Sequence, residues 1–141
     1  MLSALSESDA DYLIVGAHAL AAHGLPRATG DLDIWVRPTK ENADCVWTAI
    51  ERFGAPRRNL SRDDFCTPDV VFQIGIEPNR IDILTSITGV EFDEAWQHRK
   101  LAQINEIPVS ILGRDQLLKN KQAVGRPKDI ADIATLRQAD Q

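Results

Sequence analysis

Two aspartates stand two residues apart in the stretch RATGDLDIWV, residues 27–36. Alternate residues of a β-strand point to the same face, so we expect Asp31 and Asp33 to lie side by side. Two carboxylates in a cleft repel each other, and a proton or a cation relieves that repulsion. Carboxylate oxygens are hard ligands that suit Mg²⁺ or Mn²⁺. The pair is therefore a candidate metal site, with an exposed strand face as the alternative.

A third carboxylate occurs further along the chain, in the stretch NRIDILTSI. Asp82 stands there between Ile81 and Ile83. A neighbouring strand can bring it opposite Asp31 and Asp33. Three carboxylates can hold two metal ions, one that activates a hydroxyl group and one that binds phosphates.

The residues around the aspartates are suited to binding phosphate. The apolar run YLIV, residues 12–15, leads into Gly16 and Ala17, where backbone N–H groups can approach an anion. Arg27 and Thr29 precede the aspartate pair and offer a cation and a hydroxyl group to a polyphosphate. We interpret these four residues as candidate nucleotide or phosphate ligands. A plain strand–helix turn at Gly16 is the alternative.

Basic residues gather near the end of the chain, although the whole chain has a formal net charge of −5. That net charge argues against non-specific nucleic-acid binding, which depends on excess Lys and Arg. The candidate phosphate or acceptor contacts in this stretch are Lys119, Lys121, Arg126 and Lys128. A solvated helix face is the alternative interpretation of these charges.

The histidines and one tryptophan near these residues give weaker signals. His18 and His23 are five residues apart, whereas metal-binding pairs on a helix are more often four apart, so we do not expect them to bind zinc. Trp35 shares the strand of the aspartates, and we expect it to pack in the core.

The pattern of apolar residues predicts the elements that position these side chains. Strands are predicted at residues 12–15, 31–36, 70–76 and 80–87, with hairpins formed by 70–87 and 101–112. Helices are predicted at residues 3–10, 17–23, 92–100, 114–124 and 129–138, and between Thr39 and Gly54. The fold class is therefore α+β: a small mixed, partly antiparallel sheet with helices packed on one side and a helical C-terminal tail.

Length and composition set the wider expectations. The 141 residues, 43% of them hydrophobic, predict a single domain, residues 1–141. No apolar run approaches the roughly 18 residues of a membrane span, and the first residues do not resemble a signal peptide. Cys45 and Cys66 are expected to be free thiols. We therefore expect a cytoplasmic protein with no membrane partner.

The stretches VGAHALAAHGLPRATGDLDIWV and RIDILTSI resemble the nucleotidyltransferase superfamily that includes DNA polymerase β. The similarity is greatest to the small bacterial subgroup of AbiEii-type and minimal nucleotidyltransferases, whose C-terminal end the tail LLKNKQAVGRPKDIADIATL also resembles. The family pattern places a glycine, a hydroxyl residue, a D-x-[DE] pair and a late carboxylate in this order. Ala17 departs from it, because the second small residue is usually Gly or Ser.

The resemblance implies a metal-dependent enzyme that transfers an NMP from an NTP, such as ATP, to a hydroxyl acceptor. It implies that Asp31, Asp33 and Asp82 ligate Mg²⁺ or Mn²⁺ and act in catalysis. It also implies that Gly16 and Ala17 contact the phosphates of the nucleotide. The acceptor is an RNA end such as that of tRNA, a protein or a small molecule. A toxin–antitoxin role with a partner protein is also implied. The alternative is a weakly active or inactive module that acts by binding a partner protein.

Overall fold

A mixed β-sheet organises the chain in the computed structural model, which describes residues 1–26, 30–56, 60–76 and 78–138. Within these residues the sheet has six strands in the order β3-β4-β2-β1-β6-β5. The strands are β1 (Tyr12–Val15), β2 (Leu32–Val36), β3 (Val71–Ile74), β4 (Ile81–Leu84), β5 (Lys100–Ile104) and β6 (Ile107–Ile111). Two neighbouring pairs, β2–β4 and β1–β6, are parallel, and the other pairs are antiparallel.

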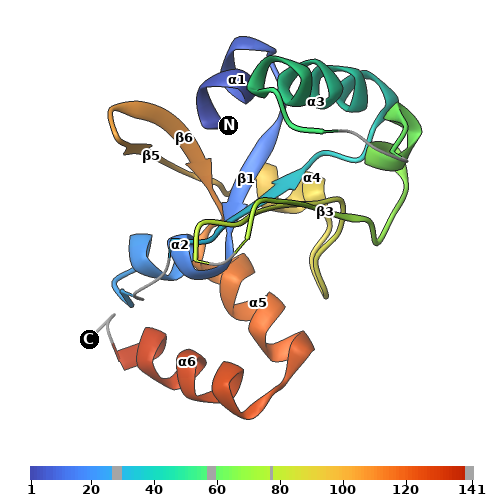
Figure 1. The fold of residues 1–141 in the computed structure, drawn as a ribbon. Coiled ribbons are helices and arrows are strands. Elements are labelled where there is room, and N and C mark those ends of the chain that lie inside the picture. Colours follow the sequence, from blue (N-terminus) through green and yellow to red (C-terminus); the bar gives the residue numbers. More distant parts are fainter. Residues whose placement is uncertain (27–29, 57–59, 77, 139–141) are drawn as a thin grey trace.

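The helices lie on both sides of this sheet. They are α1 (Leu2–Glu7), α2 (Gly16–Ala22), α3 (Lys40–Phe53), the 3₁₀ helix η1 (Arg62–Cys66), α4 (Phe92–Gln97), α5 (Arg114–Val124) and α6 (Pro127–Gln138). In Figure 1, α1 and α3 lie above the sheet, and α5 and α6 form a hairpin below it. The expected α+β class, with a mixed sheet and a helical C-terminal tail, is confirmed. The expectation that the helices pack on one side was wrong, because the chain after β6 places α5 and α6 on the face opposite α1 and α3. None of the helices in the described ranges is long and apolar enough to cross a membrane.

The central strands and α3 form because their apolar residues match the period of each element. All four residues of β1 are buried, as are Ile34, Trp35 and Val36 of β2. The hydroxyl of Thr39 accepts a hydrogen bond from the backbone N–H of Asn42 at the start of α3, as predicted from the sequence.

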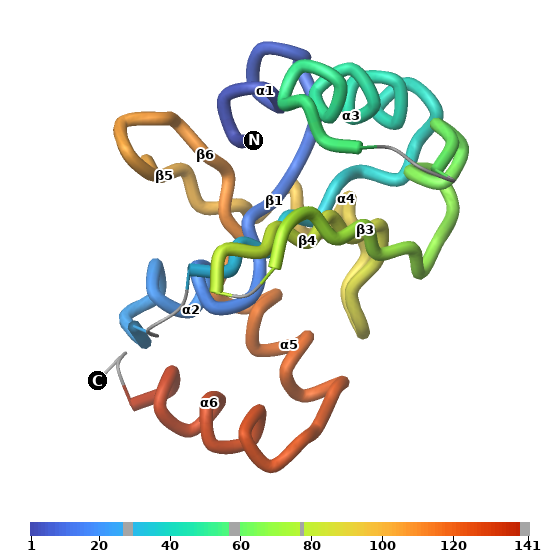
Figure 2. Tube along the Cα trace, in the orientation of Figure 1, coloured from blue at the N-terminus to red at the C-terminus, as the bar shows by residue number. Residues whose placement is uncertain are grey.

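Both predicted hairpins are present, and the tube in Figure 2 shows the β5–β6 hairpin projecting from one end of the sheet. The break in the C-terminal tail is also confirmed. Gly125 ends α5 in the left-handed conformation, with φ of 69°, and Pro127 begins α6. Cys45 and Cys66 are free, as expected.

Trp35 packs in the core, as expected, because an aromatic cluster covers it. Its ring meets the ring of Phe92 edge to face at 5.0 Å, and Phe92 stacks on Trp96 at 5.8 Å. The Arg37 guanidinium lies 4.7 Å from the centre of the Phe92 ring. This cluster fixes α4 against β2, the strand that carries Asp33.

Candidate functional site

The sheet brings together two of the three aspartates predicted from the sequence. Asp33 on β2 and Asp82 on β4 are register partners on adjacent parallel strands. Partners in a parallel pair point to the same face, so both carboxylates lie on one side of the sheet. Asp31 immediately precedes β2, and its Oδ1 accepts a hydrogen bond of 2.9 Å from the backbone N–H of Arg80. The prediction that a neighbouring strand brings Asp82 opposite the pair is thus confirmed for Asp33.

Gly16 lies directly against Asp33. It is the first residue of α2, and it has a φ of 69°, a conformation that glycine adopts far more readily than other residues. A Cβ atom placed on Gly16 would overlap Oδ2 of Asp33. Both constraints favour glycine at this position, and the backbone of the β1–α2 junction lies close to the carboxylate. Ala17 follows in the same helix.

The environment of Asp33 disfavours its charged form. Burial raises the pKa of Asp33 above its usual value, and the nearby carboxylates of Asp82 and Asp31 raise it further. The positive charge of Arg80 and the electrostatic effect of His18 act in the opposite direction, and burial still dominates. A cation bound beside these oxygens would remove this cost, which is the behaviour expected of a metal-binding carboxylate.

Arg80 is a basic partner of the site that was not predicted from the sequence. Its Nε donates to Asp82 Oδ1 at 2.9 Å and its Nη2 donates to Asp82 Oδ2 at 3.2 Å, so the guanidinium binds both carboxylate oxygens. The signal was present in the sequence, because residues 80 and 82 are two apart and share one face of an extended segment.

His18 was expected near the candidate phosphate residues, but its effect on Asp33 was not predicted from the sequence. Its charge influences Asp33, and its Nε2 atom is buried with no hydrogen-bond partner among the described residues. The pattern of residues on α2 does not reveal the effect of His18 on Asp33, because Asp33 lies on a strand 15 residues further along the sequence.

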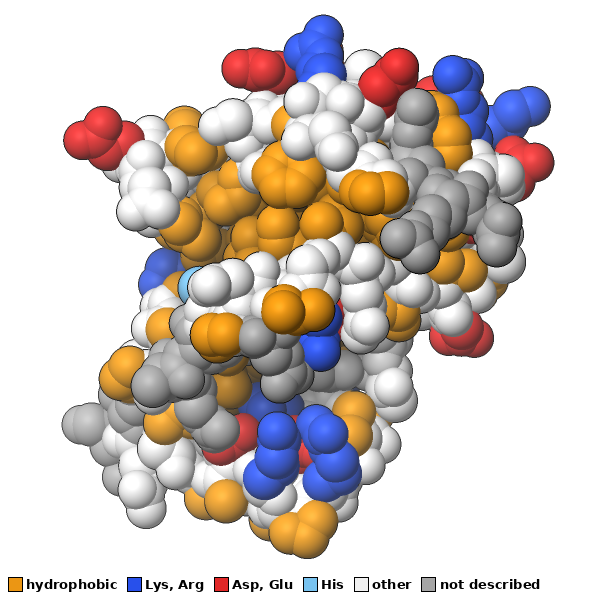
Figure 3. Space-filling model, viewed as in Figure 1, with side chains coloured by type: hydrophobic (Ala, Val, Ile, Leu, Met, Phe, Trp, Pro, Cys, Tyr) orange, Lys and Arg blue, Asp and Glu red, His pale blue; other side chains and the backbone are white. Residues whose placement is uncertain are grey.

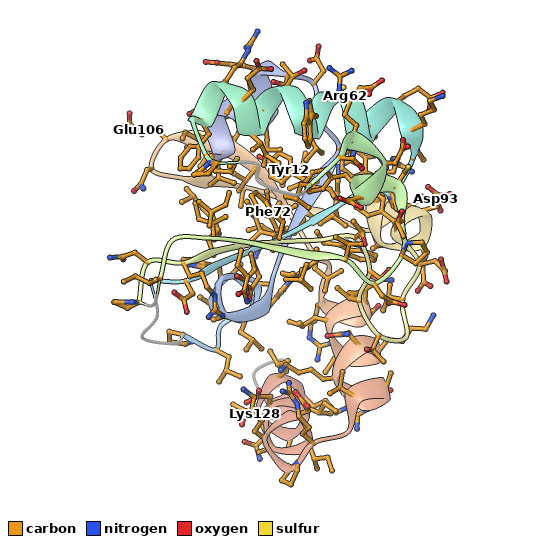
Figure 4. The ribbon with its side chains drawn as sticks, turned by 45° about the vertical axis from the view of Figure 1, so that its right-hand side comes forward. Tyr12, Arg62, Phe72, Asp93, Glu106 and Lys128 are labelled. Carbon is orange, nitrogen blue, oxygen red and sulfur yellow. The ribbon has the colours of Figure 1, made fainter. Side chains whose placement is uncertain are left out.

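A cleft of about 280 Å³ lies between the aspartate strand and the C-terminal helices. Its lining includes Gly16, Ala17 and Asp33 on one side and Lys121, Arg126 and Lys128 on the other. The remaining lining residues are Leu20, Leu117, Asn120, Asp129 and Asp132. Figure 3 shows basic and acidic side chains mixed over the C-terminal helices, and Figure 4 shows Lys128 on this helical hairpin. Three of the four predicted basic residues therefore face the predicted phosphate residues.

Lys119, the fourth, is placed differently. Its Nζ forms an ion pair of 2.8 Å with Glu94 of α4, and it does not line the cleft. The cleft-lining face of α5 and the face that contacts α4 are different sides of one helix, so residues of similar charge have different surroundings.

Lys121 is buried rather than solvated, in a network that joins α5 to α6. Its Nζ lies 2.9 Å from Asp132 and 3.3 Å from Asp129, and Arg126 Nε lies 2.7 Å from Asp129. The Arg126 hydrogen bond is the largest cause that lowers the pKa of Asp129 to about 2, and Lys121 contributes further. Neither acid was predicted from the sequence, although their spacing of three residues on a helix places them on one face.

The donor atoms fit a hard divalent cation, but the arrangement differs from the predicted three-carboxylate centre. Among the described residues, no group of three His, Cys, Asp or Glu side chains is placed to hold a metal ion. Arg80 lies among these carboxylates: its side chain donates to both oxygens of Asp82, and its backbone N–H donates to one oxygen of Asp31. The predicted phosphate ligands Arg27 and Thr29 lie outside the described residues.

The described residues form an open mixed sheet with helices on its faces. A solved structure from Thermotoga maritima, described as a "putative nucleotidyltransferase", aligns with a TM-score of 0.59 and 16% sequence identity. The alignment covers 97% of this chain and 86% of that one. The likeness shows a shared fold. Comparisons with family models and with curated proteins find no match.

Proposed function

We propose that this protein is a metal-dependent nucleotidyltransferase that moves an NMP from an NTP to a hydroxyl acceptor. The observation that carries the proposal is the pairing of Asp33 with Asp82 on adjacent parallel strands. Asp33 itself lines a cleft that Gly16 and basic side chains also line. The shared fold with a nucleotidyltransferase-like structure supports the same reaction class.

The proposed reaction forms a bond between the acceptor oxygen and the α-phosphorus of the NTP. The bond from that phosphorus to the bridging oxygen breaks, and pyrophosphate leaves with the electron pair. The acceptor hydroxyl gives its proton to a carboxylate of the site, for which we propose Asp82. Asp33, Asp82 and Asp31 would hold Mg²⁺ or Mn²⁺. A bound divalent ion would supply charge neutralisation at the phosphates and activate the acceptor hydroxyl.

The cleft offers the charges that a triphosphate needs. Lys128 is exposed on the far wall, so its side chain can contact phosphate oxygens. Arg126 is also exposed there, but its guanidinium is paired with the buried carboxylate of Asp129. Lys121 forms ion pairs with Asp129 and Asp132, so in this proposal it stabilises the packing of α5 against α6. Gly16 and Ala17 bring backbone N–H groups to the opposite wall. In this proposal Arg27 and Thr29 support the phosphates.

A second candidate function is a non-catalytic module that binds a partner protein. The bonds of Arg80 to both oxygens of Asp82 favour it, because they already supply this carboxylate with a positive partner. Ala17 in place of Gly or Ser points the same way. A pairing with a toxin or antitoxin protein, as in the AbiEii-type subgroup, belongs to this candidate.

The test is a transfer assay with each α-labelled NTP, Mg²⁺ or Mn²⁺, and acceptors of three kinds: tRNA, protein and small-molecule alcohols. We expect label transfer by the wild-type protein and its loss in Asp33→Asn. The control is Asp115→Asn, which makes the same charge change on a side chain that is 86% exposed and outside the cleft. Nucleotide binding with no transfer under either metal would support the second candidate. Transfer that survives both Asp33→Asn and Asp82→Asn would refute the site.

A further inference from the structure

The Arg80 guanidinium donates hydrogen bonds to both carboxylate oxygens of Asp82, the atoms that a metal ion would use as ligands. We propose that Arg80 is an autoinhibitory counter-ion: it holds Asp82 in the metal-free protein, and a divalent cation must displace it before Asp82 can act as a ligand. This inference rests on the proposed function and concerns the regulation of the same site.

The ion pair between Arg80 and Asp82 is bidentate, a geometry typical of strong contacts between arginine and a carboxylate. Nε and Nη2 donate to the two different oxygens of Asp82, at 2.9 Å and 3.2 Å. Charge-assisted contacts of this kind are stronger than neutral hydrogen bonds, and they hold the carboxylate in one orientation. The Asp82 side chain is only 12% exposed, so water screens the contact weakly. A metal ion therefore competes with a well-formed partner for these oxygens.

The backbone of Arg80 is fixed, so only its side chain has to move. Its N–H donates to Asp31 Oδ1 at 2.9 Å, and its carbonyl oxygen accepts from the N–H of Leu32 at 2.9 Å. These bonds tie Arg80 to the start of β2 on both sides of its Cα. The side chain is 27% exposed and has access to solvent. Displacement therefore needs a change of side-chain rotamer and leaves the sheet intact.

Like charges explain why the metal-free protein needs such a counter-ion. Asp33 and Asp82 are register partners, and Asp31 lies two residues before Asp33 in the chain. Without a cation, partly buried carboxylates at this spacing repel one another. Arg80 supplies one positive charge, whereas a divalent ion supplies two and contacts the oxygens more closely. The two cations therefore substitute for each other at Asp82.

The test is the affinity for Mn²⁺ alone, measured by calorimetry without nucleotide, so that the readout does not depend on activity. Arg80→Gln removes the competing charge, and we expect Mn²⁺ to bind about tenfold more tightly. Arg80→Lys keeps the charge but loses the two-pronged contact, so we expect an intermediate affinity. Arg62→Gln is the control, because it removes an exposed arginine paired only loosely with Asp44 at 3.6 Å. Unchanged or weaker binding in Arg80→Gln would overturn the proposal.

The outcomes separate this inference from the proposed function. Mn²⁺ binding that is lost in Asp33→Asn but unaffected in Arg80→Gln would refute the counter-ion role and leave the metal site standing. No Mn²⁺ binding by the wild type or by Arg80→Gln would refute both.

A second measurement uses the wild-type protein, in case the variants do not fold. The NMR signal of Arg80 Nε–Hε should shift and exchange faster with water as Mg²⁺ is added, and a signal unchanged at saturating Mg²⁺ would overturn the proposal.

Discussion

Gly16 and Asp33 are in close contact across the junction of β1 and α2, with no room for a side chain between the glycine Cα and the carboxylate. Val15, the residue before Gly16, is the register partner of Asp33. The position of the carboxylate therefore depends on the residue at the end of the neighbouring strand, and a change at Gly16 tests the site without removing any functional group.

Gly16→Ala should displace the Asp33 side chain and impose strain at a positive φ. We expect a loss of about 1–3 kcal/mol in the free energy of unfolding, together with a loss of nucleotidyl transfer. Gly24→Ala is the matched control. Gly24 has a φ of 94°, but a Cβ there meets nothing within 4 Å, so its cost should be about 1 kcal/mol with no effect on transfer. Urea unfolding and the transfer assay check both; equal losses of transfer would contradict the contact.

Asp33→Asn should make the metal-free protein more stable relative to the wild type as the pH rises. The pKa of Asp33 is raised by burial and by Asp82, so the carboxyl group favours the folded state at low pH and loses that contribution as pH rises through its folded pKa. Urea unfolding from about pH 4 to about pH 8 measures the gap between the two proteins. We expect the gap to grow with pH and to shrink on addition of Mg²⁺. A gap that is constant with pH would show that Asp33 carries no unfavourable charge.

Asp129→Asn should weaken the contact between α5 and α6. The pKa of Asp129 is lowered to about 2 from the ordinary 3.8, so its stabilising contribution is complete above about pH 4 and is lost as pH falls towards 2. We expect the variant to lose about 2 kcal/mol at neutral pH, with a smaller difference from wild type near the lowered pKa. Denaturation at both pH values measures this, with Asp115→Asn as the exposed control. An equal difference at both pH values would contradict the assignment.

Lys128→Gln should weaken nucleotide binding, whereas Lys119→Gln should not. Lys128 lines the cleft that contains Asp33, and Lys119 is paired with Glu94 outside it. We expect the affinity for a non-hydrolysable NTP with Mg²⁺ to fall by about three- to tenfold in Lys128→Gln. The loss should be smaller at high salt, because an exposed charge is screened. Similar losses in both variants would indicate a general charge effect instead of a contact in the cleft.

The sequence by itself determined the elements that build the site. An unbroken apolar run predicted β1 with its observed bounds, and Thr39 and Gly54 marked the ends of α3 through capping chemistry. The strand predicted over residues 31–36 agrees closely with β2, which begins at Leu32, so that Asp33 lies on the strand and Asp31 immediately precedes it. These features depend on residues within a few positions of one another, and local patterns describe such interactions well.

Only the tertiary structure decided which charged groups meet. It placed β4 beside β2, so that Asp82 is the register partner of Asp33. It also placed the Arg80 guanidinium in hydrogen-bond contact with the Asp82 carboxylate. It also separated Lys119, which contacts Glu94, from Lys121, which is buried among acids of α6. Strand order and helix packing depend on contacts between residues far apart in the chain, and the chemistry of a carboxylate is set by its burial and its nearest charges.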